Sequence, residues 1–354
     1  MNEYNDNINN ELPTGETPPT APAVDLKKAK KDFSTVGLSL CALLATVYAV
    51  IFAATFVLAL MGETGERLYN SPYTIWILNS LPMYCVAVPV ALLILRKAPS
   101  CPPERRSLSF TSMLGYVAVA VFVMNVGNYI GVFLSMLMSN GTAENAVSEL
   151  AMDTNPLKIV VMVILAPFFE ELVFRKQLID RTRIYGEKTA VMLSAILFAL
   201  FHTNMFQFFY AFFVGIVFGY IYIKSGKLRY TVIIHVFVNF MGSVVAPFVV
   251  SKLDTEMIAD LEANLETMTT EQMMAAMNEI LPGLLMYLGY SAVWGILGLA
   301  GLIIYIVKKK TVSYEPAPLQ LPAEHAATTV YMNLGIVLYI IITAAMTILS
   351  VLGG

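Results

Sequence analysis

Charged residues are scarce in this chain: Asp, Glu, Lys and Arg make up 13% of its 354 residues, while 57% are hydrophobic. Soluble domains carry about 25% charged residues. The composition therefore excludes an ordinary soluble domain and predicts a polytopic membrane protein whose main partner is membrane lipid. The formal net charge of −3 is small and gives no indication of nucleic-acid binding.

Cysteine and histidine are also rare, with three residues of each. Cys41, Cys85 and Cys101 form no CxxC pair and no even set. This pattern argues against both a disulfide framework and a zinc ribbon, so we interpret the three cysteines as structural.

Long apolar runs dominate the chain and predict an all-α, polytopic membrane helical bundle of about nine transmembrane helices. The expected spans are 35–61, 73–95, 112–138, 157–178, 187–204, 205–223, 230–251, 283–307 and 328–352. Only His202-Thr-Asn204 separates the fifth span from the sixth. One long kinked helix over 187–223 is the alternative.

The distribution of positive charge predicts a cytoplasmic N-terminus and an external C-terminus. All Lys and Arg residues except Arg67, Lys158 and Lys252 fall on the predicted inner side, which is the positive-inside pattern. Residues 1–32 have the composition of a disordered cytoplasmic tail. N-terminal transmembrane helices are expected over 33–140 and C-terminal ones over 283–354, with an amphipathic extracytoplasmic loop over 252–282 as a surface cap or a lid.

Two adjacent carboxylates and a guanidinium lie inside the predicted fourth span, at Glu170, Glu171 and Arg175. An ionisable side chain at the bilayer centre costs roughly 2.5–3.5 kcal/mol, and such residues commonly mark a pathway or a site. Glu171 and Arg175 are four residues apart and can pair on one helix face. Glu170 points about 100° away, because successive helical residues are rotated by that angle, and is predicted to face a cavity as a general base.

Other polar residues recur at helical spacing in two later spans. Phe198 precedes His202 by four residues, and Asn239 follows His235 by four. A single His or Asn in a membrane helix is more often a hydrogen-bonding contact between helices than a catalyst. Together with the Glu pair they form the acid, base and amide set of a hydrolytic or proton-handling site, whereas His325 in a loop is expected to be solvated.

These three motifs, Glu170-Glu171-x-x-x-Arg175, Phe198-x-x-x-His202 and His235-x-x-x-Asn239, resemble in order those of the CPBP intramembrane endopeptidases. That family includes the type II CAAX prenyl endopeptidases and bacteriocin-processing or immunity proteins. The resemblance covers a predicted catalytic core over about 155–250. It implies an intramembrane endopeptidase in which Glu170 activates water and His202 helps to hold it. His235 and Asn239 would stabilise the oxyanion, with Glu171, Arg175 and Phe198 in support.

The resemblance leaves the cofactor and the substrate open. Zinc could bind two histidines and two carboxylates, but HExxH is absent, and a metal-free mechanism is favoured. The expected substrate is a membrane-associated protein or peptide, with or without a covalently attached lipid. The expected location is a bacterial plasma membrane. A proton-coupled transporter or a non-catalytic immunity protein are the alternatives.

Depth poses a difficulty for one predicted site. At 1.5 Å per residue, Glu170 and His235 fall in the cytoplasmic half of the bilayer and His202 in the outer half, a gap of roughly 10 Å. A tilt or a kink near His202 would close it. Because hydrolysis needs water, we also predict a polar cavity or lateral opening between the core helices.

Overall fold

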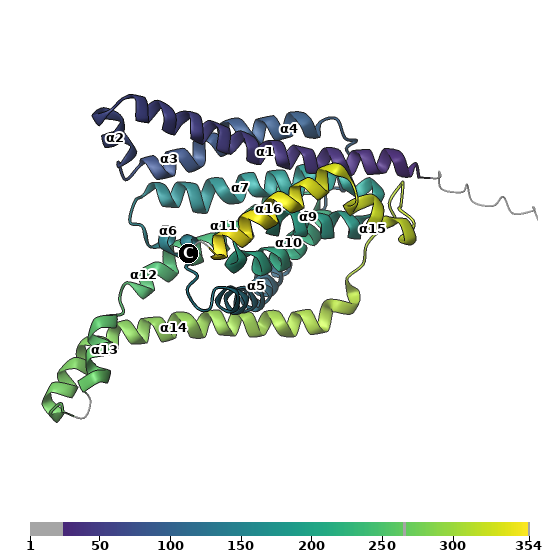
Figure 1. Ribbon diagram of the computed structural model, residues 1–354. Helices are drawn as coiled ribbons and strands as arrows, with labels where there is room; N and C mark the ends of the chain where they lie inside the picture. The colour runs from purple at the N-terminus through teal and green to yellow at the C-terminus, as the bar shows by residue number, and fades with distance from the viewer. Residues whose placement is uncertain (1–23, 265–266, 353–354) are drawn as a thin grey trace, which may run out of the picture.

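The computed structural model describes residues 24–264 and 267–352, and within these ranges the chain is helical with no β-strand. The first helix, α1 (Leu26–Leu60), and the last, α16 (Leu334–Leu352), run side by side in the same direction. The first described residues therefore lie at one end of the bundle and the C-terminus near the other (Figure 1). This polarity agrees with an odd number of crossings.

In the described part of the chain, seven helical segments are long and apolar enough to cross a membrane by length and composition, as expected of an integral membrane protein. They are Leu26–Leu60, Thr74–Leu95, Phe110–Met138, Met205–Ser225, Leu228–Val250, Thr270–Thr311 and Leu334–Leu352. The other two expected spans are helical as well, but one carries the Glu–Arg cluster and the other has only 15 residues. Both contain predicted site residues.

The N-terminal boundary of the bundle differs from the sequence prediction. Residues 26–32, assigned to the tail, form the first turns of α1, and residues 1–23 lie outside the described part of the chain. The Asp25 side chain caps the helix by accepting from the backbone N–H groups of Lys27 and Lys28. Asp32 is buried and accepts from Lys28 Nζ at 2.8 Å and Tyr185 OH at 2.6 Å. A capping aspartate and a buried polar contact thus extend the helix into a polar stretch.

The predicted break after His202 is a turn between two separate helices. Helix α9 (Glu187–Phe201) ends there, and α10 (Met205–Ser225) begins after Asn204, whose side chain accepts from Phe206 N. Thr203 adopts a positive φ of 46°. The two helices pack against each other in opposite directions, so the alternative of one long kinked helix is wrong.

Widened π-helical turns occur in several membrane segments. Three of them, η1 (Pro82–Ala87), η2 (Ile159–Leu165) and η5 (Met241–Val245), precede α4 (Val88–Leu95), α7 (Ala166–Glu170) and α12 (Ala246–Val250). Each of these following helices has proline as its second residue. Proline has no backbone N–H and disfavours the regular i→i−4 ladder, which explains the widened turn before it.

The core helices also contain a further π segment and several short elements. The stretch after α7 continues through η3 (Glu171–Ile179), α8 (Asp180–Thr182) and η4 (Arg183–Tyr185). Helix α11 (Leu228–Phe240) leads into η5. The remaining connecting helices are α2 (Glu63–Tyr69), α3 (Thr74–Leu81), α6 (Ala146–Met152), α15 (Ala323–Tyr331) and η6 (Lys309–Thr311).

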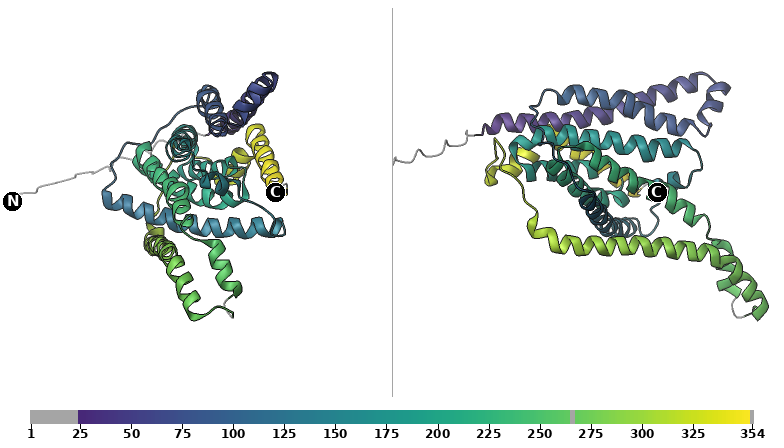
Figure 2. Two further views of the ribbon diagram at one scale, coloured as in Figure 1. Left: turned by 90° about the vertical axis from the view of Figure 1, so that its left-hand side faces the viewer. Right: turned by 180° about the vertical axis from the view of Figure 1, so that it is seen from behind.

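Helix α5 (Phe110–Met138) is steeply inclined to its neighbours: it is seen nearly end-on in Figure 1 and lengthwise in the left panel of Figure 2. It packs closely on α10 because Gly127 and Gly131 have no side chains. A Cβ at these positions would meet the backbone of α10 at Tyr210 and Phe206, respectively. Small residues commonly allow such close helix contact in membranes.

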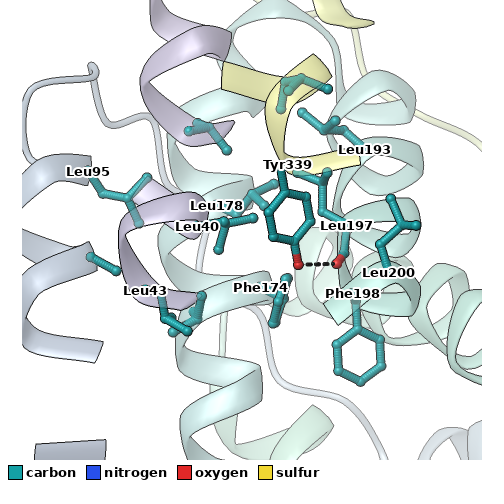
Figure 3. Packing of buried hydrophobic residues seen from close by; sticks show 14 of the residues in the cluster. Leu40, Leu43, Leu95, Phe174, Leu178, Leu193, Leu197, Phe198, Leu200 and Tyr339 are labelled. Atoms are coloured by element: carbon teal, nitrogen blue, oxygen red, sulfur yellow. Dashed lines mark hydrogen bonds between the residues drawn. The ribbon is translucent and has the colours of Figure 1, made fainter. Parts of the chain in front are cut away.

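The largest apolar cluster surrounds the segment that carries the site (Figure 3). Leu40 and Leu43 of α1 and Leu95 of α4 lie near Phe174 and Leu178 of η3. Tyr339 of α16 is fully buried and donates from its hydroxyl to Leu197 O of α9 at 3.1 Å. N- and C-terminal helices therefore enclose the core helices and hold η3 and α9 in place.

The outer loop forms a helical hairpin that extends beyond the bundle (Figure 1). It consists of α13 (Thr255–Asn264) and the first turns of α14 (Thr270–Lys308), which a Thr269–Gln272 capping box begins. No residue of α13 is buried. The helical character matches the expected amphipathic segment over 252–282, whereas its cap or lid role stays a prediction.

Candidate active site

The two adjacent glutamates differ sharply in exposure. The side chain of Glu171 is fully buried and that of Glu170 is 18% exposed. Glu170 ends α7 and Glu171 begins η3, so the helix rotates one carboxylate inward and leaves the other accessible. Glu170 is therefore the carboxylate that a substrate or water can reach.

Glu171 and Arg175 form the predicted ion pair, with Arg175 Nε 3.2 Å from Glu171 Oε2. The contact is ionic without hydrogen-bond alignment, because within the described ranges neither this oxygen nor any guanidinium nitrogen meets a hydrogen-bond partner. The Arg175 guanidinium carbon instead lies 4.3 Å from the Phe198 ring centre, a cation–π contact. Phe198 thus has a defined role in the cluster as the ring that supports the arginine.

His235 of α11 lies between the two carboxylates. Its Nδ1 is 3.0 Å from Glu171 Oε1, and its Nε2 is 3.6 Å from Glu170 Oε2. The Glu171 carboxylate accepts a hydrogen bond from Nδ1–H and so orients the imidazole. In many active sites a third group positions the catalytic acid or base in this way. Both nitrogens of His235 face glutamates, and its oxyanion role stays a prediction.

His202 joins the cluster through Phe198. The two rings are 4.8 Å apart, and the Phe198 ring is 6.0 Å from that of His235. His202 Nδ1 is 2.8 Å from Phe198 O, and since a carbonyl only accepts, Nδ1 carries the hydrogen and Nε2 is left as an acceptor. Both imidazoles contact one phenylalanine, so His202 lies next to the site, although no hydrogen bond links it to Glu170 among the described residues.

Asn239 is engaged by the backbone of a neighbouring helix. Its Nδ2 donates to Met162 O at 2.8 Å. In the π turn, Ala166 N–H donates to Val161 O, five residues back, so the next donor in this pattern would be residue 167. That residue is Pro167, which has no N–H, and Asn239 replaces the missing donor.

Replacing Asn239 by leucine should therefore destabilise the protein. The variant leaves a Met162 carbonyl without its donor, at a cost of about 1–3 kcal/mol for a desolvated polar group. The measurement is the free energy of unfolding in mixed detergent–denaturant solution, compared with Asn264→Leu, whose amide donates to Asp260 within the exposed α13. Equal stability of the two variants would contradict the proposed backbone role.

A partly open cavity reaches Glu170 from the N-terminal helices. Its wall contains Glu170, Asn79 and Tyr84 as polar groups and is otherwise apolar, with Leu43, Met83, Val88, Phe169, Val173, Phe174 and Phe201. The expected polar opening between core helices is thus replaced by a mostly apolar one between the core and α1, α3, η1 and α4. Sequence reasoning missed Tyr84 because nothing in the spacing of an isolated membrane tyrosine indicates its neighbour.

The arrangement of donors does not match a zinc site of three protein ligands. Within the described ranges no group of three or more His, Cys, Asp or Glu side chains could hold a metal ion. His235 directs both nitrogens at carboxylates, and His202 uses one nitrogen on a carbonyl. Absence of a cofactor stays an expectation.

The fold and the site together define a class: a polytopic helical membrane protein with a buried Glu–Arg–His cluster beside a partly accessible glutamate. Residues 153–241 match the family model described as Rce1-like, type II CAAX prenyl endopeptidase Rce1-like. The matched segment contains all three motifs and confirms the resemblance to the CPBP family, which indicates a peptidase. No curated protein and no solved structure matches the chain.

Proposed function

We propose that the protein is an intramembrane endopeptidase that hydrolyses peptide bonds with a water activated by Glu170. The observation that carries this proposal is the division between the two glutamates. Glu171 is buried and orients His235, while Glu170 lies on a cavity wall within 3.6 Å of His235 Nε2. Glu171 thus has a structural role, and Glu170 is accessible for catalysis.

The proposed reaction uses Glu170 as general base and then as general acid. Glu170 takes a proton from water, whose oxygen attacks the carbonyl carbon of the scissile peptide. The electron pair of the C=O bond moves to oxygen. Collapse of this tetrahedral species breaks the C–N bond, and Glu170 returns the proton to the leaving nitrogen. His235, oriented by Glu171, has its Nε2 3.6 Å from Glu170 Oε2 and so lies close to the carboxylate whose charge changes. His202 Nε2 can accept from the water.

The substrate that fits this site is a segment of a membrane-associated protein or peptide. The cavity wall is mostly apolar and begins at helices that face lipid, so an extended apolar segment could enter without leaving the membrane. A lipid-modified chain end, as the family description implies, fits the same surface. We propose a bacterial plasma membrane as its location, with which the positive-inside pattern is compatible.

Cleavage by the purified, full-length protein in liposomes is the direct test. Internally quenched peptides carrying apolar segments, with and without a prenylated Cys near the C-terminus, should be cut, and mass spectrometry should locate one bond. Cleavage that persists after chelation, in protein containing no metal, would support the glutamate mechanism. Proton uptake by the liposomes with every peptide left intact would instead favour a transporter, and neither activity would favour an immunity protein.

A further inference from the structure

Tyr84 lies against the candidate active site but comes from outside the segment that matches the family model. It is part of η1, and its ring stacks on that of Phe169 with centres 4.7 Å apart and planes 15° apart. Phe169 immediately precedes Glu170, and Tyr84, Phe169 and Glu170 line the same cavity. The backbone there is a π turn, which often occurs at functional sites.

The Tyr84 hydroxyl is a hydrogen-bond donor on the cavity wall. Within the described ranges it meets no hydrogen-bond partner, and the tyrosine lines the same cavity as Glu170. The second side-chain donor on the cavity wall is the amide of Asn79, and its Nδ2 donates to Ile75 O of the same helix at 2.8 Å. Tyrosine hydroxyls in apolar surroundings usually find a partner, so this donor is available to a group that enters the cavity.

Peptide hydrolysis needs such a donor. Negative charge develops on the carbonyl oxygen during attack, and a positioned donor there is commonly worth a large factor in rate. The groups to which the resemblance assigns this role are already engaged: Asn239 donates to Met162 O, and both nitrogens of His235 face carboxylates. The N–H groups of Arg175 are unpartnered but fully buried, and Glu170 is the only motif residue on the described cavity wall. The cavity therefore has a general base but no donor from the motifs.

We propose that the Tyr84 hydroxyl donates a hydrogen bond to the carbonyl oxygen of the scissile peptide opposite Glu170 and stabilises the oxyanion. Tyr84 keeps its proton throughout. Glu170 alone moves protons, from the water to the leaving nitrogen, while the electron pair on the oxyanion returns to carbon as the C–N bond breaks. The inference rests on the proposed peptidase function and adds a catalytic residue from the N-terminal helices.

The test compares Tyr84→Phe with wild type on the most rapidly cleaved peptide of the quenched library. Phenylalanine keeps the ring on Phe169 and removes only the hydroxyl, so we expect kcat to fall by about 10²-fold, with KM within about twofold and an unchanged thermal midpoint. Tyr129→Phe is the matched control, because Tyr129 is 75% exposed on α5, and it should leave kcat unchanged.

Two further measurements separate this role from packing. The first is the kcat of Tyr84→Leu, a variant that removes the stacked ring as well as the hydroxyl. If the ring alone mattered, Tyr84→Phe would keep the wild-type kcat and only Tyr84→Leu would lose it. Affinity for a peptide aldehyde, whose hydrate mimics the tetrahedral species, should fall by the same factor as kcat in Tyr84→Phe. Wild-type kcat and aldehyde affinity in Tyr84→Phe, with Glu170→Gln inactive, would overturn this inference alone, while an active Glu170→Gln would overturn both proposals.

Discussion

Replacing Glu170 by glutamine is expected to lower kcat for peptide cleavage by roughly 10²–10⁴-fold, the usual contribution of a general acid–base group. Glutamine has nearly the same volume and keeps a polar group near His235 Nε2, but it cannot take a proton from water. Glu170 is also only partly enclosed, so the protein should still fold. The measurement is kcat and KM on the same quenched peptide, with the thermal midpoint recorded in parallel.

Glu149→Gln provides the control for Glu170→Gln. Glu149 lies exposed on α6 and in none of the motifs, so this variant should cleave at the wild-type rate. If Glu170→Gln cleaves as fast as Glu149→Gln, the assignment of the general base is wrong. A large loss of kcat without loss of folding separates a catalytic role from a structural one.

Replacing Arg175 by methionine is expected to destabilise the protein by about 3–5 kcal/mol, because removing one partner leaves a buried charge uncompensated. Arg175 and Glu171 both have fully buried side chains, and the guanidinium also covers the Phe198 ring. Unfolding followed by intrinsic fluorescence in mixed detergent and denaturant would measure the change.

A surface arginine or lysine should behave differently. Lys176→Met is the neighbouring control, since its ammonium is 3.6 Å from Asp180 and its side chain is 41% exposed, and such pairs contribute about 0–1 kcal/mol. The double variant Glu171→Leu with Arg175→Met should recover part of the lost stability, because no buried charge stays unpaired. Equal losses of stability in Arg175→Met and Lys176→Met would contradict the expected cost of leaving the buried Glu171 charge unpaired.

The sequence predicted the helical class and most of the site because both depend on local spacing. Apolar runs predicted the spans, and charges in apolar runs drew attention to Glu170, Glu171 and Arg175. The i and i+4 spacing predicted the Glu171–Arg175 pair, which the structure confirms at 3.2 Å. The turn at His202 separates two helices, in agreement with the nine-span interpretation and not with the kinked alternative.

Some boundaries and contacts were wrong or missed for identifiable reasons. The tail was extended to residue 32 because Lys27–Lys31 looks polar, whereas capping by Asp25 and the buried Asp32 start α1 at Leu26. Depth counted at 1.5 Å per residue ignored the π turns and the helix inclination, and His202 in fact contacts the same phenylalanine as His235. Prolines 89, 167 and 247 were a readable signal for the widened turns.

Sequence alone therefore determined that charged and polar residues of three helices need partners in an apolar interior. Only the tertiary structure decided which partner each one meets. His235 lies between two glutamates, and Asn239 compensates for Pro167. Tyr84, from a helix much earlier in the chain, stacks on Phe169 and lines the same cavity as Glu170. Contacts of this kind depend on how helices rotate and pack, and no spacing within a single helix specifies the face of a distant one.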